Sequence, residues 1–283
     1  MPTALQQLLG ETPKGQFVAE TFLRQPLSRA GAAQQLCEAG SWEALAKIVG
    51  RGDVDRMIVR RGEQYQGSLE DLDALVGDGY TILVRHAEQH CPRLKAIADD
   101  FARDFAAPVN IHLYATPPGE WGFPWHYDAE EVFIVQTAGR KEYSLRKNTV
   151  HPWPLEETLP ADMHYEREIM PLLRVELAAG DWLYIPGGWW HKAQTRGDEV
   201  ALSLAIGVMP RTAIDVFDHL RTKLLDSLVW RQRLPILGEA RGEADAAAPL
   251  REMLHMLGED LRREMQRAAL AAELERQFLR AQE

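Results

Sequence analysis

Two short segments carry side chains that could bind a metal ion. The first, "FPWHYDAEEVF" at 123–133, places His126 two residues before Asp128, and the second, "AAGDWLYIPGGWWHKAQ", contains His191, 65 residues after His126. A His-x-Asp pair is weak evidence by itself, because the chain has 9 histidines and 42 acidic residues. If a β-barrel brings the segments together, two imidazoles and a carboxylate form the facial triad of non-haem Fe(II) oxygenases. A tetrahedral zinc site is the alternative.

Other histidines have a spacing that could also suit a metal. His86-x-Glu88 and His164-x-Glu166 resemble the pair above, and His86 and His90 are four residues apart, which suits two ligands on one helix. Nothing else in their surroundings supports a site. We therefore interpret these histidines as solvated or hydrogen-bonded side chains.

Lys141 is a candidate anion-binding residue. It lies in "TAGRKEYSL", 15 residues after His126, just past a turn at Ala138–Gly139. There it could point back into the mouth of the same barrel, where a buried ammonium is costly unless an anion meets it. A dicarboxylate co-substrate could chelate the metal with one end and present the other to Lys141. An exposed strand lysine is the alternative.

The elements that must position these residues are mainly β-strands. Residues 107–209 contain short, β-rich runs separated by Gly, Pro and Asn, which is typical of a small barrel or jelly roll. The runs are "VNIHLYAT", "EVFIVQTAG", "KEYSLRK", "LLRVELAAG", "DWLYIPG" and "EVALSLAIGV". Residues 1–106 are mixed α/β, with helical spacing in "GAAQQLCEAGSWEALAKIVG", "GSLEDLDALVGDG" and "CPRLKAIADDFARDF" and strand patterns in "DRMIVRRG" and "GYTILVRHA".

Residues 210–283 have a helical pattern. The segment "TAIDVFDHLRTKLLDSLVW" places apolar residues on one stripe, "ILGEARGEADAAAP" is a polar linker, and 249–283 repeats apolar residues at a period close to 3.5. The stripes are formed by Ile214, Phe217, Leu220, Leu224 and Leu228, and by Leu250, Leu254, Leu257, Leu261, Met265 and Ala268. They could dock on their own domain or on a second copy of the chain, and we expect a homodimer through these C-terminal helices.

Composition excludes several classes of partner. A net charge of −10 argues against nucleic acid, whose binding depends on clustered Lys and Arg. No apolar run is long enough to span a membrane, and the N-terminus has no secretion signal. The two cysteines, Cys37 and Cys91, lie far apart, so we expect a reduced, cytoplasmic protein without a disulfide framework.

At these residues the sequence resembles the JmjC-type and cupin-like hydroxylases, which are Fe(II)- and 2-oxoglutarate-dependent oxygenases. The resemblance rests on "NIHLYATPPGEWGFPWHYDAEEVFIVQTAGRKEYSL" and "GDWLYIPGGWWHKA". It implies a mainly β fold with α, namely a double-stranded β-helix (a cupin-like jelly roll) with N-terminal α/β elements and C-terminal helices. It also implies that Fe(II) is held by His126, Asp128 and His191, that Lys141 binds the distal carboxylate of 2-oxoglutarate, and that O2 is the second co-substrate.

Two branches of the family are similar in detail. The asparaginyl hydroxylase of hypoxia-inducible factor shares the His-x-Asp pair, the lysine and "WWH", but it has threonine and asparagine where this chain has Phe123 and Val132. The other contacts to 2-oxoglutarate must therefore differ, and Tyr114, Thr116 and Ser203 are the candidates. The ribosomal-protein hydroxylases have a similar barrel and helical dimerisation region. They continue into a winged-helix domain that is not evident before Glu283.

The resemblance implies hydroxylation of a C–H bond in a protein or peptide side chain, coupled to decarboxylation of 2-oxoglutarate to succinate. Two alternatives remain open, the same chemistry on a small molecule or natural product, and a non-catalytic cupin that binds a metal. The aromatic residues next to the ligands could be walls that exclude water or ordinary packing. They are Phe123, Trp125, Trp189 and Trp190.

Overall fold

The structure is a computed structural model, and it describes residues 2–67, 72–165, 169–235 and 247–280. The chain divides into two compact units, Met1–Pro210 and Arg211–Glu283. Each is described by itself below. Within the described residues, no helix is long and apolar enough to cross a membrane.

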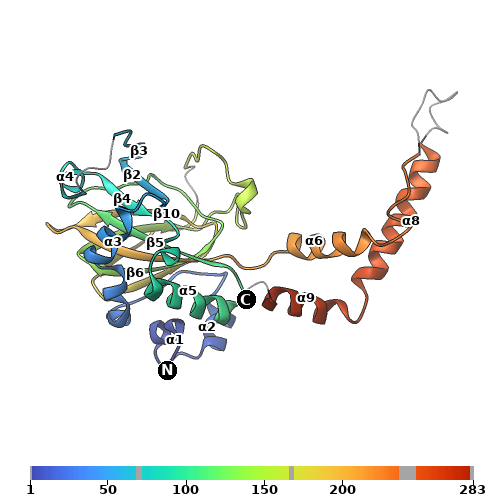
Figure 1. Cartoon of the computed structure of the whole chain (residues 1–283), viewed down its shortest axis with the longest axis horizontal. Coiled ribbons are helices and arrows are strands. Elements are labelled where there is room, and N and C mark those ends of the chain that lie inside the picture. Colours follow the sequence, from blue (N-terminus) through green and yellow to red (C-terminus); the bar gives the residue numbers. More distant parts are fainter. Residues whose placement is uncertain (1, 68–71, 166–168, 236–246, 281–283) are drawn as a thin grey trace. The chain divides into compact units, whose positions relative to one another are not determined.

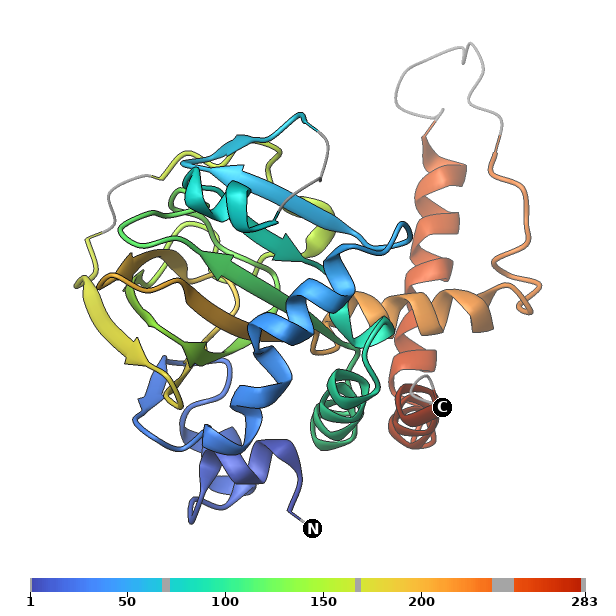
Figure 2. The ribbon, with the colours of Figure 1, turned by 60° about the vertical axis from the view of Figure 1, so that its left-hand side comes forward.

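The first unit is built on two antiparallel sheets (Figures 1 and 2). Eight strands form the large sheet in the order β1-β9-β6-β11-β5-β4-β2-β3, and three form the small sheet in the order β10-β7-β8. The strands are β1 (Leu27–Arg29), β2 (Arg56–Arg60), β3 (Glu63–Gln64), β4 (Thr81–Val84), β5 (Val109–Thr116), β6 (Glu131–Ala138), β7 (Arg140–Arg146), β8 (Leu173–Ala178), β9 (Trp182–Ile185), β10 (Trp190–Arg196) and β11 (Ala201–Val208). The predicted fold class, mainly β with flanking helices, is confirmed.

The strands at the centre of the large sheet are buried on both faces. On β6, Val132 and Ile134 pack in the core between the two sheets, whereas Phe133 and Val135 pack in a second core under the helices. A strand covered on both sides needs no alternation of polar and apolar residues. This explains why "EVFIV" is almost uninterrupted in its apolar character.

Helices cover the outer face of the large sheet (Figure 2). α5 buries Leu94, Ile97, Ala98 and Phe101, whose spacing of three, four and seven residues places them on one side of the helix. Pro92 occupies its first turn, where a missing N–H costs nothing. The helices are α1 (Ala4–Leu9), α2 (Lys14–Glu20), η1 (Gln34–Gly40), α3 (Trp42–Val49), α4 (Leu72–Gly77), η2 (Ala87–Gln89), α5 (Pro92–Phe105) and η3 (Glu156–Thr158).

The sequence pattern misses some elements of this unit. β1 and β10 are not among the predicted strands, and the helical stretch predicted across 31–50 is a 3-10 helix followed by α3, whose N-cap is Ser41. β1 to β4 come from the predicted N-terminal region 1–106, yet they pair in the same sheet as β5, β6, β9 and β11. The large sheet therefore continues across the predicted boundary at residue 107.

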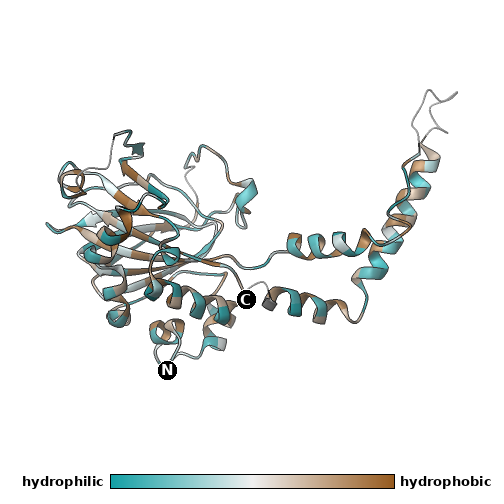
Figure 3. Cartoon of the chain, viewed as in Figure 1, coloured by the Kyte–Doolittle hydropathy of each residue, from teal (hydrophilic) through white to brown (hydrophobic). Residues whose placement is uncertain are grey.

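In the described part of the second unit the helices are α6 (Ala213–Leu224), α8 (Ala248–Met265) and α9 (Leu270–Arg280). Hydrophobic and hydrophilic residues alternate along all three helices (Figure 3). The predicted repeat over 249–283 is divided between α8 and α9, and most of the predicted linker, 236–246, lies outside the described residues. His219 of α6 hydrogen-bonds Gln277 of α9, and the indole of Trp230, in the segment after α6, donates to Asp260 of α8 at 3.0 Å.

Truncation of Phe133 tests the outer core. Its ring is fully buried and contacts the rings of Phe101, Phe105 and Tyr184, among others. We expect Phe133→Ala to lower the free energy of unfolding by about 3–5 kcal/mol in chemical denaturation. Trp153→Ala is the matched control, because that side chain is 87% exposed, and its effect should stay within about 0.5 kcal/mol. Equal effects of the two variants would contradict this account of the core.

Candidate metal centre and its cavity

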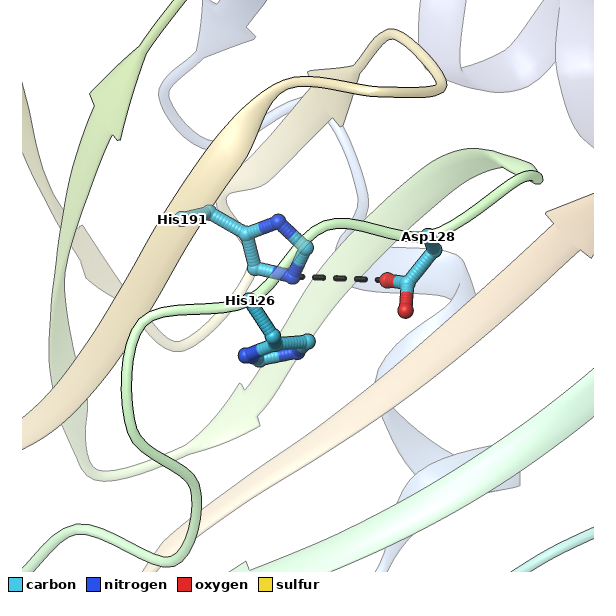
Figure 4. A group of neighbouring side chains, drawn as sticks. All are labelled: His126, Asp128 and His191. Atoms are coloured by element: carbon cyan, nitrogen blue, oxygen red, sulfur yellow. Dashed lines mark ion pairs between the residues drawn. The ribbon is translucent and has the colours of Figure 1, made fainter. Parts of the chain in front are cut away.

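Backbone hydrogen bonds bring the two metal-binding segments together. His126 and His191 form an isolated antiparallel bridge, in which the N–H of His126 donates to the carbonyl of His191 at 3.1 Å and the reverse bond is 2.8 Å. The N–H of Gly188 donates to the carbonyl of Asp128 at 2.7 Å. The segment before β6 is thereby paired with the start of β10, and the three side chains converge (Figure 4).

The second ring nitrogen of each histidine is held by a backbone carbonyl. Nδ1 of His126 lies 2.8 Å from the oxygen of Pro124, and Nδ1 of His191 lies 3.0 Å from the oxygen of Trp189. Because a carbonyl oxygen only accepts, Nδ1 must carry the hydrogen, and Nε2 keeps its lone pair for another partner. Nε2 of His191 lies 3.4 Å from Oδ2 of Asp128, and one ligand atom from each of the three side chains lies within 4.8 Å of the others.

The electrostatics of His191 favour its metal-binding form. Burial, with a smaller contribution from the neighbouring His126, lowers the pKa of this imidazole to about 4, and Asp128 opposes the shift. His191 is therefore neutral at physiological pH, as a metal ligand must be. Within the described ranges, no fourth His, Cys, Asp or Glu joins the group. Two imidazoles and one carboxylate fit an octahedral Fe(II) with three open positions better than a closed structural zinc site.

The three side chains line a cavity of about 370 Å³ that extends between the sheets. Its floor is the inner face of β11, with the small residues Ser203, Ala205 and Gly207 at every second position. All seven residues that the sequence predicted for the site line this cavity, namely His126, Asp128, His191, Lys141, Tyr114, Thr116 and Ser203. Their roles as ligands of metal and co-substrate stay predictions.

Lys141 forms a cationic end of the cavity. Its side chain, on β7, is only 4% exposed, its Nζ donates to Oγ of Ser203 at 3.1 Å, and it lies 5.4 Å from the centre of the Tyr114 ring. No ion pair joins it to any carboxylate in the described part of the chain, and burial lowers its pKa to about 7. A buried ammonium with spare donors fits an anionic ligand better than an empty cavity.

Glu130 also lines the cavity, and it was not predicted for the site. Its neighbour Asn110 is not one of the lining residues. Nδ2 of Asn110 donates to Oε1 of Glu130 at 2.5 Å. Burial, together with nearby acids including Asp128 and Glu156, raises the pKa of Glu130 to about 7, and the hydrogen bond from Asn110 opposes this shift. "HYDAEE" does show a second and third acid after Asp128, but only the fold reveals that Glu130 faces the cavity while Glu131 bonds Tyr184.

His112 also lines the cavity without having been predicted. Its Nδ1 accepts from the backbone N–H of His86 at 3.2 Å, so Nε2 carries the hydrogen. Burial lowers the pKa of His112 to about 4, which keeps it neutral. The sequence contains one sign that His112 could line the cavity. On a strand, side chains two residues apart point to the same side, so His112 lies on the same face of β5 as the predicted site residue Tyr114.

The other candidate histidines stay outside the metal group. Nδ1 of His86 lies 3.7 Å from Glu88, and Nδ1 of His90 lies 3.9 Å from Asp53. Neither pair belongs to a set of three ligands among the described residues. His164 lies on a separate small pocket, and its predicted companion Glu166 lies outside the described residues.

The aromatic residues next to the ligands divide between cavity and packing. Phe123 lines the cavity, 6.3 Å from the ring of Tyr114. Trp125 stacks on Tyr165 at 4.6 Å, Trp190 packs edge-on against Tyr127, and Trp189 packs against the core between the sheets. Of the four, only Phe123 is a wall of the cavity as described.

Comparison with known proteins connects this geometry to a family. A family model described as the JmjC domain matches residues 86–216, which include all three ligand candidates. The chain is 31% identical over 155 residues to the bifunctional lysine-specific demethylase and histidyl-hydroxylase NO66 of Drosophila mojavensis, covering 55% of this chain and 17% of that protein. It is 31% identical over 138 residues to ribosomal oxygenase 1 of Gallus gallus, covering 47% of this chain and 23% of that protein. The chain thus spans less than a quarter of either relative.

Solved structures share the fold. YcfD, a ribosomal oxygenase from Escherichia coli solved in complex with cobalt and 2-oxoglutarate, superposes with a TM-score of 0.61 at 18% identity, covering 95% of this chain and 71% of that one. Another structure of E. coli YcfD gives a TM-score of 0.62 at 21% identity, over 87% of this chain and 67% of that one. At this identity the likeness concerns the fold, and it supports the predicted jelly-roll core.

Removal of one imidazole tests the metal centre. We expect His126→Ala to weaken Mn(II) binding by more than about 100-fold in anaerobic calorimetry, since loss of a direct ligand should exceed the 10–100-fold typical of an outer partner. His164→Ala is the control, because it removes a histidine that is not in the group. Mn(II) binding that is equally strong in both variants would exclude this site.

Proposed function

We propose that the chain is an Fe(II)- and 2-oxoglutarate-dependent oxygenase that hydroxylates a C–H bond of a protein or peptide side chain, and the match of residues 86–216 to the JmjC domain supports this. One observation carries the proposal. The cavity that holds His126, Asp128 and His191 also holds Lys141, a buried ammonium without a carboxylate partner in the described chain. Metal donors and an anion site in one cavity match the needs of a chelating dicarboxylate.

In this proposal His126, Asp128 and His191 hold Fe(II). When bound, the iron supplies the oxidative chemistry, in which O2 and 2-oxoglutarate yield succinate, CO2 and a hydroxylated product. The carbonyls of Pro124 and Trp189 fix the orientation of both imidazoles by accepting from Nδ1, which leaves Nε2 of each available to bind the metal. The carboxylate of Asp128 offsets part of the positive charge.

Lys141 orients the co-substrate from the opposite side. Its ammonium is positioned by Ser203 and the Tyr114 ring, and it would form a charge-assisted bond with the distal carboxylate of 2-oxoglutarate. Tyr114, Thr116 and Ser203 are the neighbouring polar groups on this wall. The apolar residues Val132 and Ile134 line the same cavity.

A protein substrate is supported by the relatives, whose names describe a histidyl-hydroxylase with lysine demethylase activity and a ribosomal oxygenase. Hydroxylation of a small molecule and a non-catalytic cupin remain the alternatives. The cavity of about 370 Å³ has room for a co-substrate and one side chain, and it is not a closed pocket for a large metabolite. We also propose a cytoplasmic location, which agrees with the free thiols Cys37 and Cys91.

Turnover of 2-oxoglutarate tests the proposed activity. With Fe(II) and O2, the purified chain should convert 2-oxoglutarate to succinate, and His126→Ala should abolish the conversion. Lys141→Ala should raise the KM for 2-oxoglutarate by about 10- to 100-fold, because it removes a charge-assisted hydrogen bond. Lys95→Ala, which removes an exposed lysine on α5, should have no effect. Normal succinate formation by His126→Ala would end the proposal.

The pH dependence of 2-oxoglutarate binding follows from Lys141. Because its pKa is about 7, the free protein loses the binding-competent ammonium as pH rises above 7. The apparent Kd of the Mn(II)-loaded protein should therefore increase by about tenfold per pH unit between about pH 8 and pH 9. Lys141→Arg should flatten this slope, since a guanidinium stays charged. Anaerobic calorimetry between about pH 8 and pH 9 measures the Kd for 2-oxoglutarate of the wild-type chain and of Lys141→Arg. Identical pH slopes in the two proteins would contradict the role of Lys141 in binding 2-oxoglutarate.

We further propose that the second unit forms a homodimer. Several of its large apolar side chains are exposed, including Ile214, Phe217, Leu228, Leu254 and Met265. Leu228 is 75% exposed, although it continues the apolar stripe that buries Leu220 and Leu224 on α6. Such surfaces on helices are typical of association between chains.

Light scattering after gel filtration tests the dimer. The wild-type chain should elute at twice its mass of 32.0 kDa, and the double variant Phe217→Asp/Leu228→Asp should elute as a monomer because it places charge on the apolar face. Ile169→Asp is the control, since that side chain is exposed in the first unit. A monomeric wild-type chain at about 50 μM would contradict this part of the proposal.

A further inference from the structure

The turn before β10 decides where His191 lies. β9 belongs to the large sheet and β10 to the small sheet, so the chain crosses from one sheet to the other through residues 186–189. The N–H of Trp189 donates to the carbonyl of Pro186 at 3.2 Å, which closes the turn, and Gly188 has a φ of +78°, in the region that favours glycine. His191 follows two residues after the turn, so its position depends on how firmly the turn is held.

Two consecutive N–H groups attach this turn to the segment that carries the other ligand candidates. The N–H of Gly188 donates to the carbonyl of Asp128 at 2.7 Å. The N–H of Gly187 donates to Oε1 of Glu131, the first residue of β6, at 3.0 Å. The first bond is between main-chain groups, whereas the second depends on the type of one side chain. A movement of the turn away from Glu131 would therefore move His191 relative to Asp128.

The carboxylate of Glu131 is buried and held by a second donor. The residue is 5% exposed, and no salt bridge among the described residues includes it. The hydroxyl of Tyr184 donates to its Oε2. The same hydroxyl accepts from the backbone N–H of Leu23 at 2.8 Å, so its single hydrogen is free to point at Glu131. With Oε2 occupied in this way, Oε1 is directed to Gly187.

A carboxylate is a costly residue at a buried position without a cation. Burial raises the pKa of Glu131, and the hydrogen bonds from Tyr184 and Gly187 oppose the rise. An apolar side chain of similar size would avoid the cost of removing a charge from water. It could not accept a hydrogen bond from Gly187 and Tyr184 at once. The bond to the turn is the property that distinguishes Glu131 from a residue that only fills space.

We propose that Glu131 is a positioning residue of the metal centre, whose carboxylate holds the turn at 186–189 and thereby keeps His191 beside His126 and Asp128. That these three side chains bind a metal rests on the function proposed above. Glu131 does not line the cavity, so it acts through the main chain of the turn. Its loss leaves all three ligands in the chain and loosens their arrangement.

Mn(II) binding to the full chain, measured by anaerobic calorimetry, tests this role. Glu131→Leu keeps the approximate size of the side chain but accepts no hydrogen bond, and we expect it to weaken Mn(II) binding by at least about tenfold, as loss of an outer partner does. Glu131→Gln keeps an oxygen for Gly187, so its affinity should stay within about twofold of the wild-type value. If Glu131→Leu does not fold, Glu131→Asp replaces it. Its shorter carboxylate cannot reach both Gly187 and Tyr184, and we expect a loss of at least about fivefold.

Val135→Ala is the matched control for a loss of stability. Val135 is fully buried on the same face of β6 as Glu131, four residues or about 13 Å along the strand. The variant should unfold at a lower urea concentration but keep an Mn(II) affinity within about twofold of the wild-type value, because sites this far apart usually act independently. Wild-type affinity in Glu131→Leu, or an equal loss in Val135→Ala or Glu131→Gln, overturns the role of Glu131.

Amide hydrogen exchange in the metal-free chain gives a readout that does not depend on the oxygenase. We expect the N–H groups of Gly187 and Gly188 to exchange at least about fivefold faster in Glu131→Leu than in the wild-type chain, because the turn opens locally when one hydrogen bond is lost. Unchanged exchange at both glycines also overturns the proposal. Faster exchange in Glu131→Leu, beside a wild-type chain that binds no Mn(II), would reject the oxygenase and keep the positioning of His191 by Glu131.

Discussion

The pairing of His126 with His191 through reciprocal backbone hydrogen bonds is the constraint on which the candidate site depends. Side chains alone could not hold two imidazoles and a carboxylate within a few ångströms, since each would lose rotamer freedom on ordering. Here the main chain fixes the Cα positions, and the carbonyls of Pro124 and Trp189 fix the rings. The metal ligands are therefore arranged before any ion binds, and binding does not have to order them.

The same two-sheet architecture creates the cavity and its polarity. Burial of both faces of the large sheet makes the frame rigid, while the small residues of β11 leave room between the sheets. Lys141, on β7, is buried without an opposite charge from the described chain, and the half-buried Glu130 precedes β6. A buried ammonium costs stability in the empty protein, and an anionic ligand at Lys141 would compensate for that cost.

Much of this could be predicted from the sequence. The strands from β5 to β9 and β11 follow from short β-rich runs between Gly, Pro and Asn, and α5 follows from its apolar spacing. Lys141 could be placed near the ligands because a tight turn connects β6 to β7. In contrast, β1 and β10 lack a distinctive pattern, and β10 carries His191. The residues of β10 do not alternate regularly between polar and apolar, so the sequence does not predict a strand there. The strand forms because it pairs with β7, which is distant along the chain.

The sequence by itself determined which residue types were available, namely a His-x-Asp pair, a later histidine, a lysine after a turn, and the periodicities of the elements that carry them. These are local properties, set by side-chain chemistry and by the two backbone periods. Only the tertiary structure decided that Glu130 rather than Glu131 faces the cavity and that Asn110 and Glu130 meet above Gly207. Such decisions depend on strand register and on segments far apart in the chain, where a shift of one residue reverses the direction of every side chain.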